Sequence, residues 1–191
     1  MRARLVIGVL VLLLAGGSAH AQGMAAPAET QVSLLFKILT FDRRLATRPP
    51  GNVMVIAVVF QTGYRASLVA RNQIVDALKA MKDSTISGHP VHCVAVEWQD
   101  GEQVRLALIQ ERTDVVYVTP LRGVELAPIV RAARAAGMTT FTGVPLYLEQ
   151  GLALGVRLVR ERPQIIVNLP ATRAEGSDFS SQLLRVSSVI E

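Results

Sequence analysis

The sequence predicts an α/β fold: one three-layer domain with a mostly parallel sheet, helices on both faces, a C-terminal antiparallel β-hairpin and a terminal helix. Two observations support this class. Four short apolar runs alternate with amphipathic segments between residues 53 and 142, which is typical of right-handed βαβ units. Beyond residue 150, two apolar runs follow each other across a polar break, which indicates a pair of strands joined as a hairpin.

The chain begins with the features of a secretory signal peptide. Arg2 and Arg4 precede an apolar run at 5–14, and Ala19-His20-Ala21 has the A-x-A form of a cleavage site. A spanning helix needs about 20 apolar residues, so this shorter run disfavours a membrane anchor. We therefore predict a periplasmic protein with three parts: a signal peptide at 1–21, a flexible leader at 22–28 and an α/β domain at 29–191.

The charge and cysteine content limit the kinds of partner and of stabilising interaction that the chain can have. Cleavage after Ala21 removes two of the 20 basic residues and none of the 15 acidic ones, which leaves a net charge of +3. The basic residues are scattered, with local clusters only at 43–44 and 157–162, so no nucleic-acid-binding surface is predicted. Cys93 is the single cysteine, which excludes an intramolecular disulfide. Stability must then come from packing or from association, for example as a homodimer.

The first element expected in the domain is a helix that begins near Glu29. Apolar side chains recur on one of its faces at helical spacing: Leu34, Ile38, Phe41 and Leu45. The breaker cluster at 48–52 should end it. We interpret Arg43 and Arg44 as cations at the C-terminal end of this helix, where they suit the helix dipole.

Four strands and three crossover helices are expected next. The run at 53–60 is continuously apolar and rich in β-branched residues, as a strand covered on both faces requires. The other strands are predicted at 91–98, 114–118 and 138–142. The intervening helices are predicted to end near Met81, to start at an Asp100 N-cap and reach about Arg112, and to span 125–136 before a C-terminal Gly137.

The last part of the chain is predicted as a hairpin followed by a helix. Alternating apolar residues at 152–158 and a second run at 164–169 flank the polar break Glu161-Arg162-Pro163. The spacing of four later apolar residues is that of one helix face: Phe179, Leu183, Val186 and Ile190.

A ligand in such a sheet is expected beyond the carboxyl ends of the strands. The side chains there could suit a small polar or anionic molecule: Gln61, Thr62, Tyr64, Trp98, Thr119, Arg122 and Thr142. The alternative is that these are ordinary βα turns, which favour such residues for backbone reasons. We favour the alternative, because the fold alone does not indicate a ligand site and the sequence does not reveal the geometry of a pocket.

No catalytic site, metal site or cofactor is predicted. On a strand, His92 and Cys93 point to opposite faces, and His89 lies in a loop without a further Cys or His cluster to complete a tetrahedral site. No serine lies in a G-x-S-x-G nucleophile elbow. The segment 61–65 also lacks the G-K-[ST] ending of a phosphate-binding loop.

The segment PQIIVNLPATRAEGSDFSSQLLRVSSVI resembles the C-terminal signature of the YfiR-like family. In that signature a strand ending in Asn leads through Ala- and Gly-containing turns to a serine-rich helix start and Leu-Leu. The matching residues are Asn168, Ala171, Gly176, Ser180, Ser181, Leu183 and Leu184. The likeness extends more loosely from Phe36 through the strands at 53–60 and 115–118.

This resemblance implies a periplasmic protein that acts without catalysis. Members of the family repress a membrane-bound diguanylate cyclase by binding its periplasmic part, which lowers cyclic-di-GMP output and biofilm formation. Two features differ from the family pattern. Well-known members carry disulfide-paired cysteines, whereas this chain has Cys93 alone, and the motif Phe-x-x-Tyr-x-x-Trp-Pro is replaced by Phe36-Lys-Ile-Leu-Thr-Phe41-Asp-Arg.

Three hypotheses about function follow. The leading one is a periplasmic regulatory protein that binds a membrane protein through an exposed apolar patch, expected on the hairpin. The second is a solute-binding protein of an ABC-type transporter, although about 170 residues suffice for only one lobe. The third, an exported hydrolase, lacks a constellation of nucleophile, base and orienting group.

Overall fold

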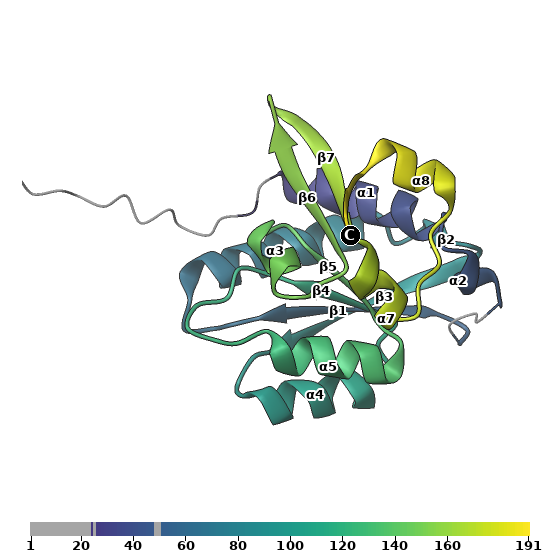
Figure 1. The fold of residues 1–191 in the computed structure, drawn as a ribbon. Coiled ribbons are helices and arrows are strands. Elements are labelled where there is room, and N and C mark those ends of the chain that lie inside the picture. Colours follow the sequence, from purple (N-terminus) through teal and green to yellow (C-terminus); the bar gives the residue numbers. More distant parts are fainter. Residues whose placement is uncertain (1–23, 25, 48–50) are drawn as a thin grey trace, which may run out of the picture.

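The computed structural model describes residues 24, 26–47 and 51–191, so the predicted signal peptide lies outside the described residues. The strands are β1 (Met54–Phe60), β2 (Thr85–Ile86), β3 (His89–Glu97), β4 (Val115–Val118), β5 (Thr139–Thr142), β6 (Leu154–Val159), β7 (Arg162–Asn168) and β8 (Ser188–Ile190). The helices are α1 (Ala28–Leu39), α2 (Arg43–Thr47), α3 (Arg65–Ala80), α4 (Gly101–Gln110), α5 (Ala127–Ala136), α6 (Leu146–Glu149), α7 (Leu169–Ala174) and α8 (Ser181–Val186). The described strands form one sheet in the order β2-β3-β1-β4-β5-β6-β7-β8 (Figure 1).

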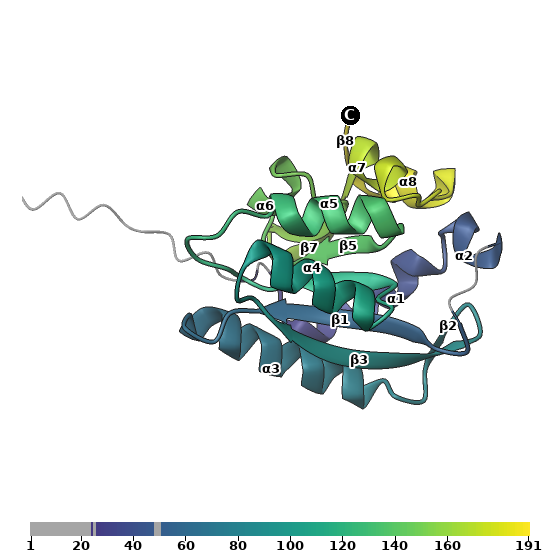
Figure 2. The same cartoon turned by 90° about the horizontal axis from the view of Figure 1, so that it is seen from below.

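The middle of the sheet is parallel, as the sequence predicts. β1 pairs in parallel with β3 on one side and with β4 on the other, so that Val58 lies opposite both Ala95 and Tyr117. Every residue of β1 is buried, which confirms the prediction of a strand covered on both faces. Figure 2 shows α3 on one side of β1 and β3, and α4 and α5 on the other. The three-layer class is therefore confirmed.

Each face of the sheet has its own apolar core. One core joins α1 and α3 to side chains such as Ile56 and Phe141. The other joins α4 and α5 to Val59 and Val118. Alternation along the strands produces this division, because successive side chains point to opposite faces. No helix in the described ranges is long and apolar enough to cross a membrane.

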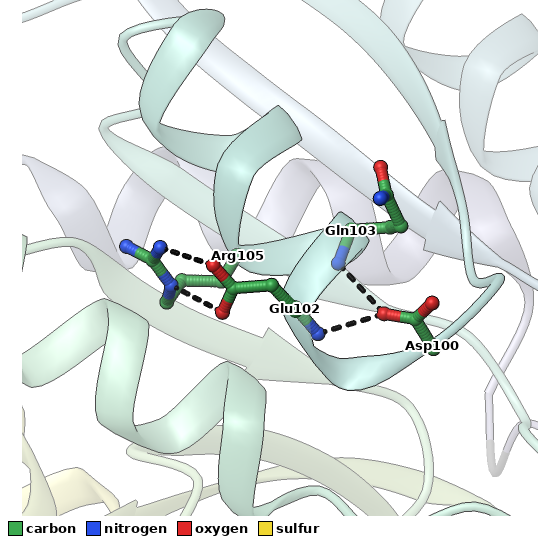
Figure 3. A network of polar contacts seen from close by, with 4 residues as sticks. All are labelled: Asp100, Glu102, Gln103 and Arg105. Atoms are coloured by element: carbon green, nitrogen blue, oxygen red, sulfur yellow. Dashed lines mark hydrogen bonds and ion pairs between the residues drawn. The ribbon is translucent and has the colours of Figure 1, made fainter.

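Two helix ends follow the sequence signals closely. Asp100 caps α4, since its Oδ1 accepts the backbone N–H groups of Glu102 at 2.9 Å and Gln103 at 2.8 Å (Figure 3). In the first turn, the Arg105 guanidinium donates two hydrogen bonds to the Glu102 carboxylate. At the end of α5, Gly137 adopts the left-handed conformation with φ 67°. Both predicted caps are confirmed.

Asp100→Ala should destabilise the domain by about 1 kcal/mol, because it leaves two N–H groups of α4 without their acceptor. The free energy of unfolding in urea measures this change. Asp100→Asn is the matched control, since its side-chain oxygen can still accept these bonds and should restore most of the stability. Equal losses in the two variants would contradict the assignment of Asp100 as the cap.

The predicted single helix between residues 29 and 45 is wrong, because the chain forms α1 and then the short α2. Asp42 lies in the break, buried, and its Oδ1 accepts the backbone N–H groups of Arg44 and Asp178, both at 3.0 Å. Asp42 also pairs as an isolated bridge with Phe179. This contact with the C-terminal segment overrides the local helical spacing. Arg43 and Arg44 begin α2 instead of ending α1, so their predicted capping role is also wrong.

The N-terminal boundary also differs from the expected leader. α1 begins at Ala28, inside the segment assigned to the leader, and Ala26 and Ala28 are both buried. The side chain of Gln31 donates to the carbonyl oxygen of Ala26 at 2.6 Å. A buried hydrogen bond thus attaches this short stretch to the domain.

The predicted hairpin is confirmed, with its turn one residue earlier than expected. β6 and β7 pair in antiparallel register, with Val159 opposite Arg162. Arg160 and Glu161 form the turn with positive φ values of 50° and 64°, the backbone geometry of a tight hairpin turn. Pro163 therefore belongs to β7, opposite Leu158, and is not part of the break.

The predicted terminal helix is only partly right. α8 ends at Val186, whose side chain is 69% exposed, and Ile190 belongs to β8. β8 pairs in parallel with the end of β7, where Val167 lies opposite Val189. Backbone bonding to a sheet edge therefore replaces the last helical turns. The short elements β2, α6, α7 and β8 had no counterpart in the sequence prediction.

Candidate functional site

The strand order places a topological switch point between β1 and β4. The chain passes from β1 through α3 to β3 on one side, then returns through α4 to β4 on the other side of β1. In open α/β sheets, the carboxyl ends of the two strands at such a point diverge and leave a crevice. Tyr64 follows β1 here and Pro120 follows β4. Both line a cavity of about 850 Å³.

Three of the predicted ligand-binding residues, namely Gln61, Thr119 and Thr142, make side-chain hydrogen bonds within the fold. The Thr119 hydroxyl is buried and donates to the Val59 carbonyl at 2.9 Å. It can therefore only accept from the buried Ser67 hydroxyl, 2.7 Å away, and Ser67 in turn accepts the N–H of Gln61 at 2.8 Å. This chain of bonds joins β1, β4 and α3. It also gives the Ser67 hydroxyl a structural role.

Thr142 has a similar structural role. Its buried hydroxyl donates to the Val118 carbonyl at 2.9 Å and accepts the N–H of Val144 at 3.0 Å. The side chain of Gln61 bonds to the backbone of Arg122 at both N–H and C=O, with distances of 2.9 and 3.2 Å. These contacts hold two βα loops together.

The remaining predicted residues are spread around the strand ends. Trp98 is half-buried against the core formed with α4 and α5, and Thr62 is exposed in its turn. Of the seven predicted side chains, Tyr64 is among those that line the cavity, whereas Thr119 and Thr142 are not. Gln61, Thr119 and Thr142 thus use their polar side chains in hydrogen bonds within the fold. The cavity next to these strand ends has a different lining.

The cavity lies between the first turns of α1 and α3. Its lining comes from the segment before α1, the first turn of α1, one face of α3 and the loop after β4: Met24, Ala26, Pro27, Ala28, Glu29, Tyr64, Arg65, Ala66, Val69, Ala70, Gln73 and Pro120. The sequence analysis did not predict these lining residues. One signal could have indicated the cavity: Val69 is an apolar residue on the polar face of an amphipathic helix, and it is 45% exposed.

A buried polar pair fixes the wall of the cavity. The Tyr117 hydroxyl donates to Gln31 Oε1 at 2.6 Å, and Gln31 Nε2 donates to the Ala26 carbonyl at 2.6 Å. Tyr117 and Gln31 are both fully buried, and burial raises the pKa of the Tyr117 hydroxyl. Gly143 lies directly against the Gln31 amide. The segment that precedes α1 is thus anchored to the middle of β4.

A second buried polar group lies at the opposite end of the sheet, near the amino end of β5. The Glu175 carboxylate accepts the Thr140 N–H at 2.8 Å and the Thr140 hydroxyl at 2.6 Å. Burial raises the pKa of Glu175 to about 7, although the bonds from Thr140 and the charge of Arg134 act in the opposite direction. This carboxyl attaches the end of α7 to the sheet.

The described residues contain no group of three or more His, Cys, Asp or Glu side chains that could hold a metal ion. Cys93 is a partly buried free cysteine, and desolvation raises the pKa of its thiol to about 11 despite the nearby charge of Lys79. The thiol is therefore protonated at neutral pH, which disfavours a nucleophilic role.

The outer half of the hairpin forms a separate surface, which we call the hairpin arm (residues 156–165). β5 pairs with β6 only at Leu154 and Gly155, and β8 pairs with β7 only from Ile166 onward. Among the described residues the arm is therefore two-stranded with both edges unpaired, and it projects beyond the helices around it (Figure 1). Leu158 and Val159 near its tip are 44% and 41% exposed.

Basic residues surround this apolar pair. Arg160 and Arg162 are exposed at the turn. Arg157 is partly buried, and it donates to Gln164 Oε1 at 2.8 Å and to Ser188 Oγ at 3.2 Å, which ties the arm to β8. The arm thus combines exposed apolar side chains, positive charge and free main-chain hydrogen-bonding groups.

The signature residues lie in the connection from β7 to α8. Asn168 caps α7 by accepting the Ala171 N–H at 3.0 Å, and its Nδ2 donates to the Leu148 carbonyl at 2.9 Å. Gly176 has φ 88°, which favours glycine. The other members either pack in the core or form the start of α8: Ala171, Ser180, Ser181, Leu183 and Leu184. Their arrangement is structural.

Solved structures with a similar fold come from several bacteria. A conserved domain protein of Vibrio cholerae O1 biovar eltor strain N16961 has TM-score 0.61 at 14% identity, over 87% of this chain and 60% of that chain. An ABC domain in complex with L-Trp from Streptococcus pneumonia has TM-score 0.57 at 12% identity, over 86% and 60%. The ligand-free, open CD0873 of Clostridium difficile, a substrate binding protein with adhesive properties, has TM-score 0.50 at 17% identity, over 78% and 58%.

At these identities the likeness shows the fold alone, and the chain spans about 60% of the length of these structures. No curated protein sequence matches the chain significantly. A family model described as YfiR/HmsC-like (DUF4154) matches residues 29–188, which is nearly the whole described domain. The chain therefore belongs to the YfiR/HmsC-like family.

Proposed function

We propose that this chain is an exported, non-catalytic regulatory protein that binds the periplasmic part of a membrane-bound diguanylate cyclase and lowers its output. Family membership supports the regulatory role, and the signal-peptide pattern at residues 1–21 supports export. The polar side chains at the strand ends are largely used in structural hydrogen bonds, which fits a role in binding rather than chemistry.

The hairpin arm is the observation that carries this proposal. Exposed apolar residues on a projecting ribbon offer a partner surface to bury, and Leu158 and Val159 provide them. The unpaired edges of β6 and β7 offer main-chain donors and acceptors to an added strand. Arg160 and Arg162 favour an acidic surface on the partner.

Leu158→Asp should weaken the complex about tenfold or more, because it places a carboxylate in the contact and removes an apolar anchor. The measurement is cellular cyclic-di-GMP in the producing bacterium after deletion of the gene and complementation, together with crosslinking of the chain to membrane proteins. Deletion should raise cyclic-di-GMP, the unchanged gene should restore the original level, and the variant should not.

Leu106→Asp is the matched control, because Leu106 on α4 is also exposed, at 36%, and lies outside the arm. This variant should restore repression and crosslink to the same membrane protein. An unchanged cyclic-di-GMP level after deletion would contradict the proposed function. If both variants repress equally, the regulatory function stands, but the contact with the partner lies outside the hairpin arm.

A second candidate is a solute-binding protein of an ABC-type transporter. The cavity at the switch point favours it, and two structures of similar fold are an L-Trp complex and a substrate binding protein. The chain covers only about 60% of them, whereas solute-binding proteins close two lobes on a ligand. Neighbouring reading frames for a permease and an ATPase would favour this candidate, and one for a membrane cyclase would favour the regulator.

A further inference from the structure

The cavity between α1 and α3 has the size and shape of a small-molecule site. Its volume of about 850 Å³ lies within the usual range of ligand pockets, about 300–1,000 Å³. Its position at the switch between β1 and β4 is where α/β sheets bind ligands. Its wall is held in place without a ligand, because Gln31 bonds to both Tyr117 and the Ala26 carbonyl. The site is thus largely preformed.

Most of the described lining is apolar, and this indicates the chemistry of one part of the ligand. Met24, Ala26 and Pro27 form the side contributed by the N-terminal segment. Val69 from α3 and Pro120 from the loop after β4 belong to the same lining. A polar ligand would leave its own groups without partners here, and that costs free energy. An apolar body is therefore required.

Two polar residues of the lining, Tyr64 and Arg65, lie together at the start of α3. Arg65 supplies a guanidinium, and the Tyr64 side chain lines the cavity next to it. The N-cap residue of α3 makes no side-chain hydrogen bond to the first turn. The positive end of the dipole of this 16-residue helix therefore faces the cavity without a side-chain cap. Glu29, in the first turn of α1, is the one acidic residue among the described residues that line the cavity.

We propose that this cavity binds a small molecule that has an apolar body and one carboxylate. The carboxylate pairs with the Arg65 guanidinium at the start of α3, and the apolar body lies against Val69 and Pro120. This binding is independent of the hairpin arm, so it does not rest on the proposed function. If the chain is a regulator, the ligand is an effector of it.

Two kinds of molecule share this chemistry, namely simple apolar carboxylates and apolar amino acids. They differ by an ammonium group, which Glu29 could receive across the cavity. Calorimetry on the mature chain with octanoate, 3-phenylpropanoate, phenylalanine and octanol separates these cases. The carboxylates should bind saturably, and octanol, which keeps the apolar body but has no charge, should bind at least about tenfold more weakly. Tighter binding of phenylalanine than of 3-phenylpropanoate would identify the amino acid as the preferred kind.

Three variants locate the binding. Val69→Trp fills the cavity from an exposed position and should abolish binding of every probe. Arg65→Gln should weaken the carboxylates about tenfold and leave octanol unchanged. Lys79→Gln lies on the same helix, outside the lining, and should change nothing. Because Arg65 is exposed, its variant tests the proposal even if Val69→Trp fails to fold. Absence of saturable binding of all three carboxylate probes, or unchanged carboxylate binding in Arg65→Gln, would overturn the proposal.

Discussion

Gly143→Ala is expected to destabilise the domain by about 3 kcal/mol, although it adds only one methyl group. A Cβ at this position would overlap the Gln31 amide, with Nε2 only 2.7 Å away and Oε1 closer still. Gln31 is fully buried and cannot swing into solvent. Its displacement would leave the buried Tyr117 hydroxyl without an acceptor, a cost of about 1–3 kcal/mol, in addition to about 1–3 kcal/mol for overpacking.

The free energy of unfolding in urea measures this effect, with Gly63→Ala as the control. Gly63 lies in the turn after β1 with no atom within 4 Å of an added Cβ, so its variant should change stability by less than about 1 kcal/mol. A double-mutant cycle sharpens the test. In a Gln31→Ala background the clash is absent, so Gly143→Ala should then cost much less. Additive losses would show that Gln31 is not the group displaced.

Glu175 is expected to make the domain less stable as the pH rises from 4.5 to 7. Burial raises the pKa of this carboxyl from 4.5 to about 7 in the folded state, so the folded state favours the protonated form. The stability that the group contributes is fully present below pH 4.5 and is lost as the pH rises through 7. This rise in pKa corresponds to about 3 kcal/mol, at about 1.4 kcal/mol per unit.

Glu175→Gln isolates this contribution, because other carboxylates also affect the pH dependence of stability. The difference in free energy of unfolding between the variant and the unchanged chain should shift by about 3 kcal/mol in favour of the variant between pH 4 and pH 8. Glu149→Gln, which removes a carboxylate from an exposed position in α6, is the control. A constant difference for Glu175→Gln across this range would mean that folding does not change the pKa of this carboxyl, and would contradict the prediction.

Local sequence signals gave correct predictions where the structure of an element depends mainly on residues close to it in sequence. The Asp100 cap, the Gly137 helix end and the fully apolar β1 were all predictable, since each depends on neighbours a few residues away. The spacing from Leu34 to Leu45 misled for the opposite reason. Its periodicity fits one helix, but Asp42 bonds to Asp178, which is distant in sequence, and the chain bends there.

The candidate site shows the same contrast. The position of the strand ends followed from the βαβ order, but not which of their side chains were available. Threonine is a residue type expected in a polar ligand site. The hydroxyls of Thr119 and Thr142, however, both donate hydrogen bonds to backbone carbonyls of neighbouring strands. The cavity wall at Met24 and Ala26 was not predictable from the sequence, because this small-residue segment resembles a mobile leader. Its anchor, the hydrogen bond from Gln31 to Ala26, becomes evident only in the structure.

The sequence by itself determined the class of fold, the parallel centre of the sheet, the hairpin and the resemblance to the family to which the chain belongs. The first three properties follow from periodicity, turn residues and caps, which act over short distances along the chain, whereas the resemblance rests on the residues of the C-terminal segment. Only the tertiary structure decided where α1 ends, that the chain closes with β8, and that an apolar cavity lies beside the polar strand ends. Each of these depends on contacts between segments far apart in sequence, and such contacts outweigh local preferences when they bury polar groups with their partners.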